Sequence, residues 1–194
     1  MVTIKIIVGT VRPGRFGIKP AEWLLNLARQ RSDAQYELVD LQTVNLPMLD
    51  EAAPPMMGTY TQEHTKKWSE LINAADGFVF IVPEYNYSFS PVLKNAIDFL
   101  WHEWNDKPVS YLGYGVVGGA RAIEQLRSVA AATKMFDLRE DVRLENFRQL
   151  LDADGNFQPT EHHLKAANTM LDQLVFWAEQ MQRARAAIDA KDKK

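Results

Sequence analysis

The chain has 194 residues, of which 46% are hydrophobic and 24% are charged, a balance typical of folded globular proteins and not of disordered ones. Its 22 Lys and Arg against 25 Asp and Glu leave a net charge of −3, so no positive field supports nucleic acid binding. Cysteine is absent, which excludes disulfides, thiolate metal sites and cysteine nucleophiles, so redox chemistry would need a bound cofactor.

The chain is short enough for one domain, because domains typically hold about 100 to 200 residues. We expect a single domain over residues 1–188 and a frayed tail over residues 189–194. The apolar start of the chain lacks a basic leader and reaches Gly9 too soon for a signal peptide, and no apolar run is long enough to span a membrane. These features predict a cytoplasmic protein with no membrane partner.

Strand and helix patterns alternate along the first half of the chain. A β-branched run over residues 4–8 predicts a buried strand, and apolar residues at helical spacing over 21–28 predict a helix after a glycine-containing loop. A second strand is expected over residues 36–41, followed by a proline-rich connection. Thr59 and Gln62 then predict a capping box at the start of another helix.

The second half continues this alternation. Residues 78–82 form the most continuous apolar run, which predicts a central parallel strand buried on both faces. The later elements are expected to be a helix after Pro91, a strand over 109–117, a helix opened by Gly118 and Gly119, a short strand over 138–144 and a long amphipathic helix over about 161–187. About five strand–helix units predict an α/β fold, in which a parallel sheet lies between two layers of helices.

Three loops follow predicted strand ends, where parallel sheets bind their ligands. The first loop, residues 9–17, offers close backbone approach, a helix start and the side chains of Thr10, Arg12 and Arg15. It predicts a phosphate site, or else a plain connection with solvated arginines. Its glycines at 9, 14 and 17 match neither a Walker loop nor the dinucleotide fingerprint.

The second loop, residues 83–90, combines aromatic rings, hydroxyls and an amide, which can hold a flat ligand. Composition alone favours the alternative that Tyr85, Tyr87 and Phe89 cover the sheet end or an oligomer interface. The third loop lies within residues 113–119, where four glycines indicate either close backbone approach or tight turns.

No metal site is predicted. His162 and His163 would point about 100° apart on a helix, so they do not share a face. The segment 152–155 does not complete a calcium loop and predicts a polar turn instead.

Four segments carry a family resemblance. They are Gly9-Thr10-Val11-Arg12, Pro83-Glu84-Tyr85-Asn86-Tyr87-Ser88, Leu93-Lys94-Asn95-Ala96-Ile97-Asp98 after Pro91, and Gly118-Gly119-Ala120-Arg121-Ala122. In this order they resemble the NAD(P)H-dependent FMN reductases, a flavodoxin-like family that includes small quinone, azo-dye and chromate reductases. The resemblance spans residues 4 to about 127 and implies a flavodoxin-like three-layer sandwich, with a five-stranded parallel sheet of order 2-1-3-4-5 and helices on both faces.

The resemblance also implies a site for FMN. Its phosphate would be held by Thr10, Arg12, Arg15, Phe16 and Gly17. Its isoalloxazine ring would be lined by Pro83, Glu84, Tyr85 and Asn86, with Gly118 and Gly119 closing the far side. Backbone N–H groups of the turn over residues 85–88 are candidates to stabilise charge on the reduced ring. No catalytic side chain is expected, because the flavin itself carries the hydride chemistry.

Two positions depart from the family pattern. Arg15-Phe16-Gly17 stands where the family often has Ser-Phe-Asn, so two side-chain phosphate ligands are lost, and the charge of Arg15 would replace them. Gly113 stands where a serine is common, so the hydrogen bond of that serine to the flavin is missing.

The implied activity is hydride transfer from NADPH or NADH through FMN to a small-molecule acceptor such as a quinone, an azo compound or free flavin. Two alternatives are a flavodoxin-type electron carrier that does not react with a nicotinamide, and a flavin-free binding protein. The family also implies a homodimer or homotetramer. Trp101 and Trp104 are candidate contact residues for it, and core packing explains either one almost as well.

Overall fold

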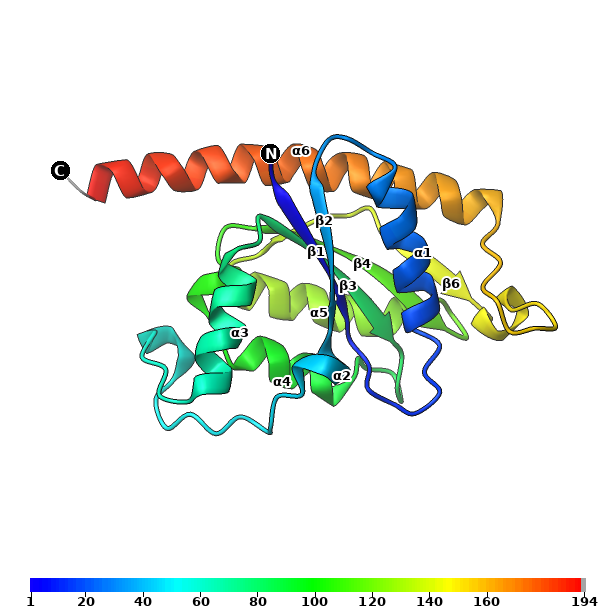
Figure 1. Cartoon of the computed structure of the whole chain (residues 1–194), viewed down its shortest axis with the longest axis horizontal. Coiled ribbons are helices and arrows are strands. Elements are labelled where there is room, and N and C mark those ends of the chain that lie inside the picture. The colour runs from blue at the N-terminus through cyan, green and yellow to red at the C-terminus, as the bar shows by residue number, and fades with distance from the viewer. Residues whose placement is uncertain (193–194) are drawn as a thin grey trace.

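Six strands form one parallel sheet in the computed structural model, which describes residues 1–192 (Figure 1). They are β1 (Thr3–Val8), β2 (Gln35–Asp40), β3 (Gly77–Pro83), β4 (Pro108–Gly115), β5 (Phe136–Asp137) and β6 (Val142–Glu145). The strand order is β2-β1-β3-β4-β5, and β6 also pairs with β4. The predicted order is therefore confirmed. At this edge the sequence predicts a single strand over residues 138–144, whereas the structure has two short strands, β5 and β6.

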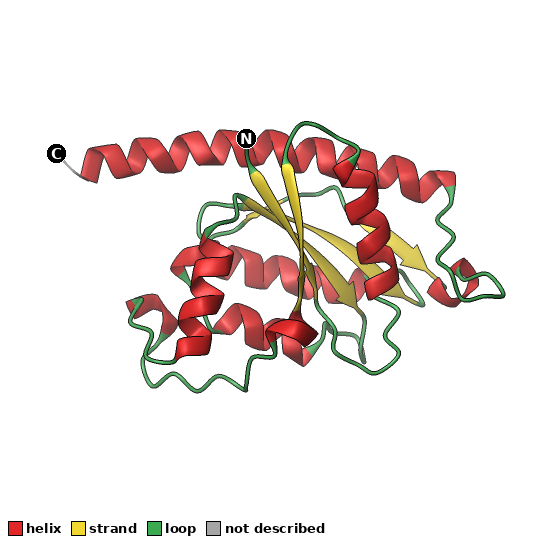
Figure 2. Cartoon of the chain, in the orientation of Figure 1, coloured by secondary structure: helices red, strands yellow, loops and turns green. Residues whose placement is uncertain are grey.

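Helices cover both faces of this sheet (Figure 2). The α-helices are α1 (Ile18–Arg29), α2 (Leu41–Val44), α3 (Glu63–Asn73), α4 (Pro91–Asp98), α5 (Ala120–Ala132) and α6 (Glu161–Asp192). Three short 3-10 helices are η1 (Pro55–Met57), η2 (His102–Trp104) and η3 (Phe147–Leu150). Side chains of α1 and α6 form one core with the sheet, and those of α2 to α5 form the other, which confirms the three-layer flavodoxin-like arrangement.

Strand side chains alternate between the two cores. On β1, Ile4, Ile6 and Val8 face α1 and α6, whereas Ile7 faces the opposite layer. All seven residues of β3 are buried, as expected for the central strand of a parallel sheet with both faces covered. The continuous apolar runs of the sequence therefore bury both faces of the strands, and the carboxyl ends of β1, β3 and β4 lie side by side.

The start of α3 differs from the prediction. The N-cap is Gln62, and its side chain makes no capping hydrogen bond, so the predicted capping box of Thr59 and Gln62 is wrong. The carboxylate of Glu51 accepts instead from the backbone N–H groups of Thr61, at 3.0 Å, and Gln62, at 2.9 Å. A side chain from an earlier loop therefore satisfies the donors that a local cap would otherwise take.

Helix α6 is longer than predicted. It is helical through Asp192, so the tail expected to fray from residue 189 remains ordered helix as far as that residue; positions 193 and 194 lie outside the described residues. In the last turns of this helix, Arg185 pairs at 2.6 Å with Asp76, the residue before β3. Within residues 1–192, no helix combines the length and apolar character needed to cross a membrane.

Trp104 belongs to the core. It is fully buried, its ring lies 4.9 Å from that of Phe78, and its indole N–H donates to the Ile97 carbonyl at 3.1 Å. Of the two proposed reasons for this residue, core packing is therefore confirmed. Trp101 is half-buried, with Lys134 over its ring at 5.1 Å.

Candidate functional site

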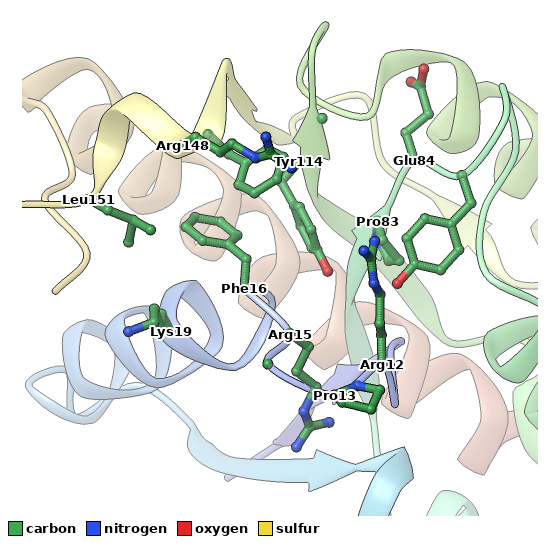
Figure 3. A pocket seen from close by; sticks show the side chains of 14 residues that line it. Arg12, Pro13, Arg15, Phe16, Lys19, Pro83, Glu84, Tyr114, Arg148 and Leu151 are labelled. Atoms are coloured by element: carbon green, nitrogen blue, oxygen red, sulfur yellow. The ribbon is translucent and has the colours of Figure 1, made fainter. Parts of the chain in front are cut away.

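A pocket of about 580 Å³ lies at the carboxyl ends of β1, β3 and β4 (Figure 3). Its volume falls in the range typical of small-molecule sites. The lining residues come from the first loop and α1, from the ends of β3 and β4, and from η3 with the residue after it. They are Arg12, Pro13, Gly14, Arg15, Phe16, Lys19, Pro83, Glu84, Tyr85, Tyr114, Gly115, Phe147, Arg148 and Leu151.

The first loop connects β1 to α1, and its backbone packs closely against β3. A Cβ at Gly9 would lie 2.8 Å from the Ile81 carbonyl oxygen, so the backbones of β1 and β3 meet here at a distance that requires glycine. Within the described chain, no backbone carbonyl accepts from the N–H of Phe16 or Gly17. Unpaired N–H groups at a helix start carry partial positive charge and favour an anion.

Arg15 is occupied within this loop. Its guanidinium donates to the Asp40 carboxylate through both terminal nitrogens, one at 2.5 Å, and to the Thr10 carbonyl at 2.6 Å. The hydrogen bond to Asp40 raises the pKa of Arg15. Burial acts against ionisation of Asp40, but the hydrogen bonds from Arg15 and the Gln42 N–H outweigh it and lower the pKa of that carboxyl. The ion pair cancels most of the charge that Arg15 was expected to offer a phosphate.

Arg12 is the more open cation of the loop. Its side chain extends across the pocket mouth toward Pro83 (Figure 3), and the residue is exposed. Lys19, on α1, donates to the Gly155 carbonyl at 2.5 Å, whereas Arg148, on η3, is exposed on the opposite side of the pocket. Arg12 and Arg148 are therefore better placed than Arg15 to meet the charge of an anionic ligand.

The second loop is a tight hairpin turn. Tyr85 and Ser88 exchange backbone hydrogen bonds of 2.7 and 3.0 Å, and the two residues between them, Asn86 and Tyr87, have φ of 48° and 72°. These angles match a type I′ turn, which is costly for a tyrosine because non-glycine residues rarely adopt positive φ. The exchange uses the N–H groups of Tyr85 and Ser88, so of the turn expected to stabilise a reduced ring these two donors already have partners. The N–H groups of Asn86 and Tyr87 remain as candidates.

An ion pair fixes the turn to α5. The Glu84 side chain is only 7% exposed and accepts from the Arg121 guanidinium at 2.6 Å. It also accepts from the Arg121 backbone N–H at 3.2 Å, at the first turn of α5. The same guanidinium lies 3.9 Å from the centre of the Tyr87 ring. Glu84 therefore orients the loop through Arg121, and its carboxylate is not free in the pocket.

The third loop folds back onto its own strand. Gly118 and Gly119 have φ of 66° and 75°, which only glycine adopts readily. A Cβ at Gly113 would lie 2.4 Å from the Gly118 carbonyl oxygen, so this backbone has no room for the serine that is common in the family. The four glycines thus serve both explanations raised by the sequence, since they permit tight turns and close backbone approach.

The structure gathers about half of the predicted site residues on the pocket wall. Those that line it are Arg12, Arg15, Phe16, Pro83, Glu84 and Tyr85. The others lie behind or beside it. Thr10 is buried and its hydroxyl is 2.9 Å from that of Tyr85, Gly17 is the N-cap of α1, Asn86 is at the turn, and Gly118 and Gly119 precede α5.

Sequence reasoning missed one wall of the pocket. Tyr114, Phe147, Arg148 and Leu151 come from the end of β4 and from η3, and Lys19 from the first turn of α1. The rings of Phe16, Tyr114 and Phe147 pack together, with centroids 4.7 to 5.4 Å apart. Tyr114 lay inside the glycine-rich segment noted above, so its hydroxyl was a usable signal. The segment 147–151 carries no motif, because only the tertiary fold brings it to this edge.

Three sequence matches bear on the family of this chain. A family model described as NADPH-dependent FMN reductase matches residues 2–149. An NAD(P)H-dependent FMN reductase of Schizosaccharomyces pombe is 45% identical over 134 residues, which cover 68% of this chain and 67% of that protein. A 2-hydroxy-1,4-benzoquinone reductase of a Burkholderia species is 29% identical over 189 residues, which cover 90% of this chain and 94% of that protein.

Solved structures share the fold. A flavoenzyme NAD(P)H:(acceptor) oxidoreductase from Paracoccus denitrificans has a TM-score of 0.74 at 24% identity, covering 93% of this chain and 99% of that one. A flavodoxin, WrbA-like protein from Agrobacterium tumefaciens has a TM-score of 0.56 at 14% identity, covering 93% and 99%. At these identities the likeness concerns the fold alone, and it agrees with the flavodoxin-like sheet order.

Proposed function

The chain belongs to the NADPH-dependent FMN reductase family, and we propose that it transfers hydride from NADPH or NADH through FMN to a small-molecule acceptor such as a quinone. The observation that carries the proposal is the pocket at the strand ends, where the N–H groups of Phe16 and Gly17, just before α1, have no backbone acceptor within residues 1–192 and lie next to a cavity walled by aromatic rings. A family member with that pocket has a place for both the anionic tail and the flat ring of a flavin.

The donor groups of the pocket fit the phosphate of FMN. The N–H groups of Phe16 and Gly17 have no backbone acceptor within residues 1–192, and the hydroxyl of Thr10 lies at the same strand end. Arg12 adds an exposed positive charge at the mouth. We propose that these groups hold the phosphate, and that Arg15 contributes by fixing the loop through Asp40. This modifies the role that the resemblance implies for Arg15.

The groups around Pro83 fit a flat ring. Glu84 is held by Arg121, so the backbone from Pro83 to the turn is fixed before a ligand enters. We propose that Pro83, Glu84, Tyr85 and Asn86 line the isoalloxazine, with Gly118 and Gly119 closing its far side. The N–H groups of Asn86 and Tyr87 have no backbone acceptor within residues 1–192, and on this turn of positive φ they can donate to an electron-rich ring edge.

FMN, when bound, supplies the electron chemistry, so the protein needs to place reactants and exclude water. The aromatic wall of Phe16, Tyr114 and Phe147 keeps one side of the pocket apolar. The mouth stays open beside Arg12 and Arg148, where a phosphate-bearing nicotinamide can approach cationic side chains. A small planar acceptor would use the same opening after the nicotinamide leaves.

Anaerobic stopped-flow spectroscopy tests this function. We expect the purified protein loaded with FMN to lose the flavin absorbance near 450 nm when mixed with NADPH or NADH, and to regain it when a quinone is added. A protein that binds FMN but is bleached by neither nicotinamide would be an electron carrier instead. A protein that binds no FMN would contradict the proposal altogether.

We also propose that the protein works as a homodimer or homotetramer in the cytoplasm. Exposed apolar side chains beside the pocket support association: Tyr87 is 66% and Val116 is 73% exposed. Such side chains are common at interfaces between subunits.

A further inference from the structure

Tyr114 is the penultimate residue of β4 and points its hydroxyl at the first loop. The residue is only 6% exposed, and its ring is held between those of Phe16, at 5.2 Å, and Phe147, at 5.4 Å. Figure 3 shows the hydroxyl reaching from the strand toward the space between Phe16 and Pro83. The ring is therefore fixed by packing, while the polar end lies at the pocket floor.

This hydroxyl lies where a side chain on Gly17 would stand. The Gly17 backbone is right-handed helical, with φ of −56° and ψ of −23°, so the conformation itself accepts any residue. A Cβ built at this position, however, would lie 2.8 Å from the Tyr114 hydroxyl oxygen and 2.9 Å from a Thr10 methyl carbon. The space that a side chain at residue 17 would enter is already filled, and a phenolic oxygen fills part of it.

The resemblance places an asparagine at residue 17, as a side-chain ligand of the phosphate, and this chain lacks it. The chain instead brings a polar atom to the same volume from another strand. Burial raises the pKa of Tyr114, and contacts from Thr10 and the Gly17 backbone offset this only in part. The hydroxyl therefore keeps its proton at neutral pH and can donate it in a hydrogen bond to an anion.

Building on the proposed function, we propose that Tyr114 binds the phosphate of FMN through its hydroxyl and so replaces the polar side chain missing from residue 17. The phosphate then meets the Gly17 N–H and the Tyr114 hydroxyl together at the start of α1. Arg15 cannot fill this role, because its guanidinium is committed to Asp40. Tyr114 and Gly17 thus form a matched pair, in which a large residue on β4 requires a small one in the loop.

Comparison of FMN with riboflavin isolates the phosphate, since riboflavin has the same ring and ribityl chain without it. We expect Tyr114→Phe to weaken FMN binding about tenfold or more, as for a lost hydrogen bond to a charged group, and to change riboflavin binding less than about twofold. Dissociation constants come from quenching of flavin fluorescence by wild type and variant. Tyr60→Phe is the control, because its hydroxyl is bonded to Glu103, away from the pocket, and its loss should affect neither flavin.

A second variant keeps the proposal testable if Tyr114→Phe folds poorly, which thermal melting would show. Gly17→Ala keeps an allowed backbone and pushes a methyl group against both the Tyr114 hydroxyl and the Thr10 methyl group, so it should also produce an FMN-selective loss. Equal losses for FMN and riboflavin, unchanged affinities, or tighter FMN binding by Tyr114→Phe would each overturn the assignment. If the wild-type protein binds neither flavin, the proposed function itself fails, which is a separate and distinguishable result.

Discussion

Arg12 and Arg15 lie three residues apart in one loop and carry the same charge, yet the structure gives them different tasks. Arg15 is clamped between Asp40 and the Thr10 carbonyl, and its side chain is only 10% exposed. Arg12 is exposed and extends across the pocket mouth. The first therefore stabilises the loop, and the second is free to meet a ligand.

Arg12→Gln tests the free cation. We expect FMN affinity to fall about two- to tenfold, because one charge-assisted contact to phosphate is lost, and riboflavin affinity to stay unchanged. The loss should shrink at high salt, since exposed charges are screened. Arg139→Gln, an exposed arginine outside this pocket, is the matched control. A riboflavin loss as large as the FMN loss would rule out a phosphate contact.

Arg15→Gln tests the clamp through stability. Removal of the guanidinium leaves the carboxylate of Asp40 without its partner, and we expect the free energy of unfolding to fall by about 2 kcal/mol at pH 7. Because the pKa of Asp40 is lowered in the folded state, its contribution is fully present above the pKa of the unfolded carboxyl, about 3.9, and is lost as pH falls through the lower folded value. Urea unfolding should therefore show a smaller difference between variant and wild type at pH 3. An equal difference at both values of pH would contradict the ion-pair account.

Among the elements, the connection from β4 to α5 folds back closely on its own strand. The loop turns back so closely that the Gly118 carbonyl occupies the space of any side chain on Gly113. The close approach also places Gly115 at the pocket wall beside Glu84. In the sequence, Gly113 marks the loss of a serine that would bind the flavin. In the structure, the backbone itself requires glycine at this position.

A serine at residue 113 should therefore destabilise the folded protein. We expect Gly113→Ser to lower the free energy of unfolding by about 1 to 3 kcal/mol, as overpacking of a core does, measured by urea unfolding. Gly113→Ala should cost about as much, because the clash comes from the Cβ atom that both residues share. A serine variant as stable as wild type would show that the loop can move aside.

Lys107 joins the start of β4 to the end of α3. Its ammonium donates to the carbonyls of Ile72, at 3.2 Å, and Asn73, at 3.1 Å. Burial, with a smaller effect of Arg185, lowers the pKa of Lys107 to about 8. Between that value and the unfolded pKa near 10.4, the unfolded state binds more protons, so the contribution of this residue to stability rises with pH.

Lys107→Met makes that slope measurable. We expect the free energy of unfolding of wild type to rise relative to the variant by about 1 to 3 kcal/mol between pH 7 and 10. Chemical unfolding of both proteins across this range gives the difference directly, and titrations common to both cancel. A constant difference would mean that the buried amine keeps an ordinary pKa.

The helices and strands were largely predictable because their patterns depend on burial. Residues 78–82 read as a central strand because both faces are covered, and α1 was visible from its apolar stripe. The cap of α3 was not predictable, because Glu51 reaches it from an earlier loop. The ion pair of Arg15 was not predictable for the same reason: its partner Asp40 ends the neighbouring strand, and no local pattern links the two.

At the scale of the whole molecule, the site depends on the strand order. The reversal between β1 and β3 brings the first and second loops side by side, and β4 adds the third. The wall formed by η3 and the residue after it then bounds one side of the pocket with Phe147 and Leu151. The motif-bearing half of the site could be predicted from the sequence, whereas this wall depends on how the chain returns after β6.

Association is a property of the whole chain and has its own test. Because exposed apolar residues flank the pocket, we expect light scattering after size-exclusion chromatography to give two or four times the chain mass of 22.1 kDa. A single-chain mass across the concentration range would contradict the proposed homodimer or homotetramer. Trp104 is buried in the core, so its substitution should lower the free energy of unfolding. A change in mass of a Trp104 variant would therefore not by itself identify a subunit contact.

The most direct test of the central claim is a crystal structure of the protein grown or soaked with FMN. We predict electron density for the phosphate at the N–H groups of Phe16 and Gly17, and for the ring against Pro83 and the turn at Asn86. Density for FMN elsewhere, or strand ends that stay closed by their own side chains at saturating FMN, would contradict the account.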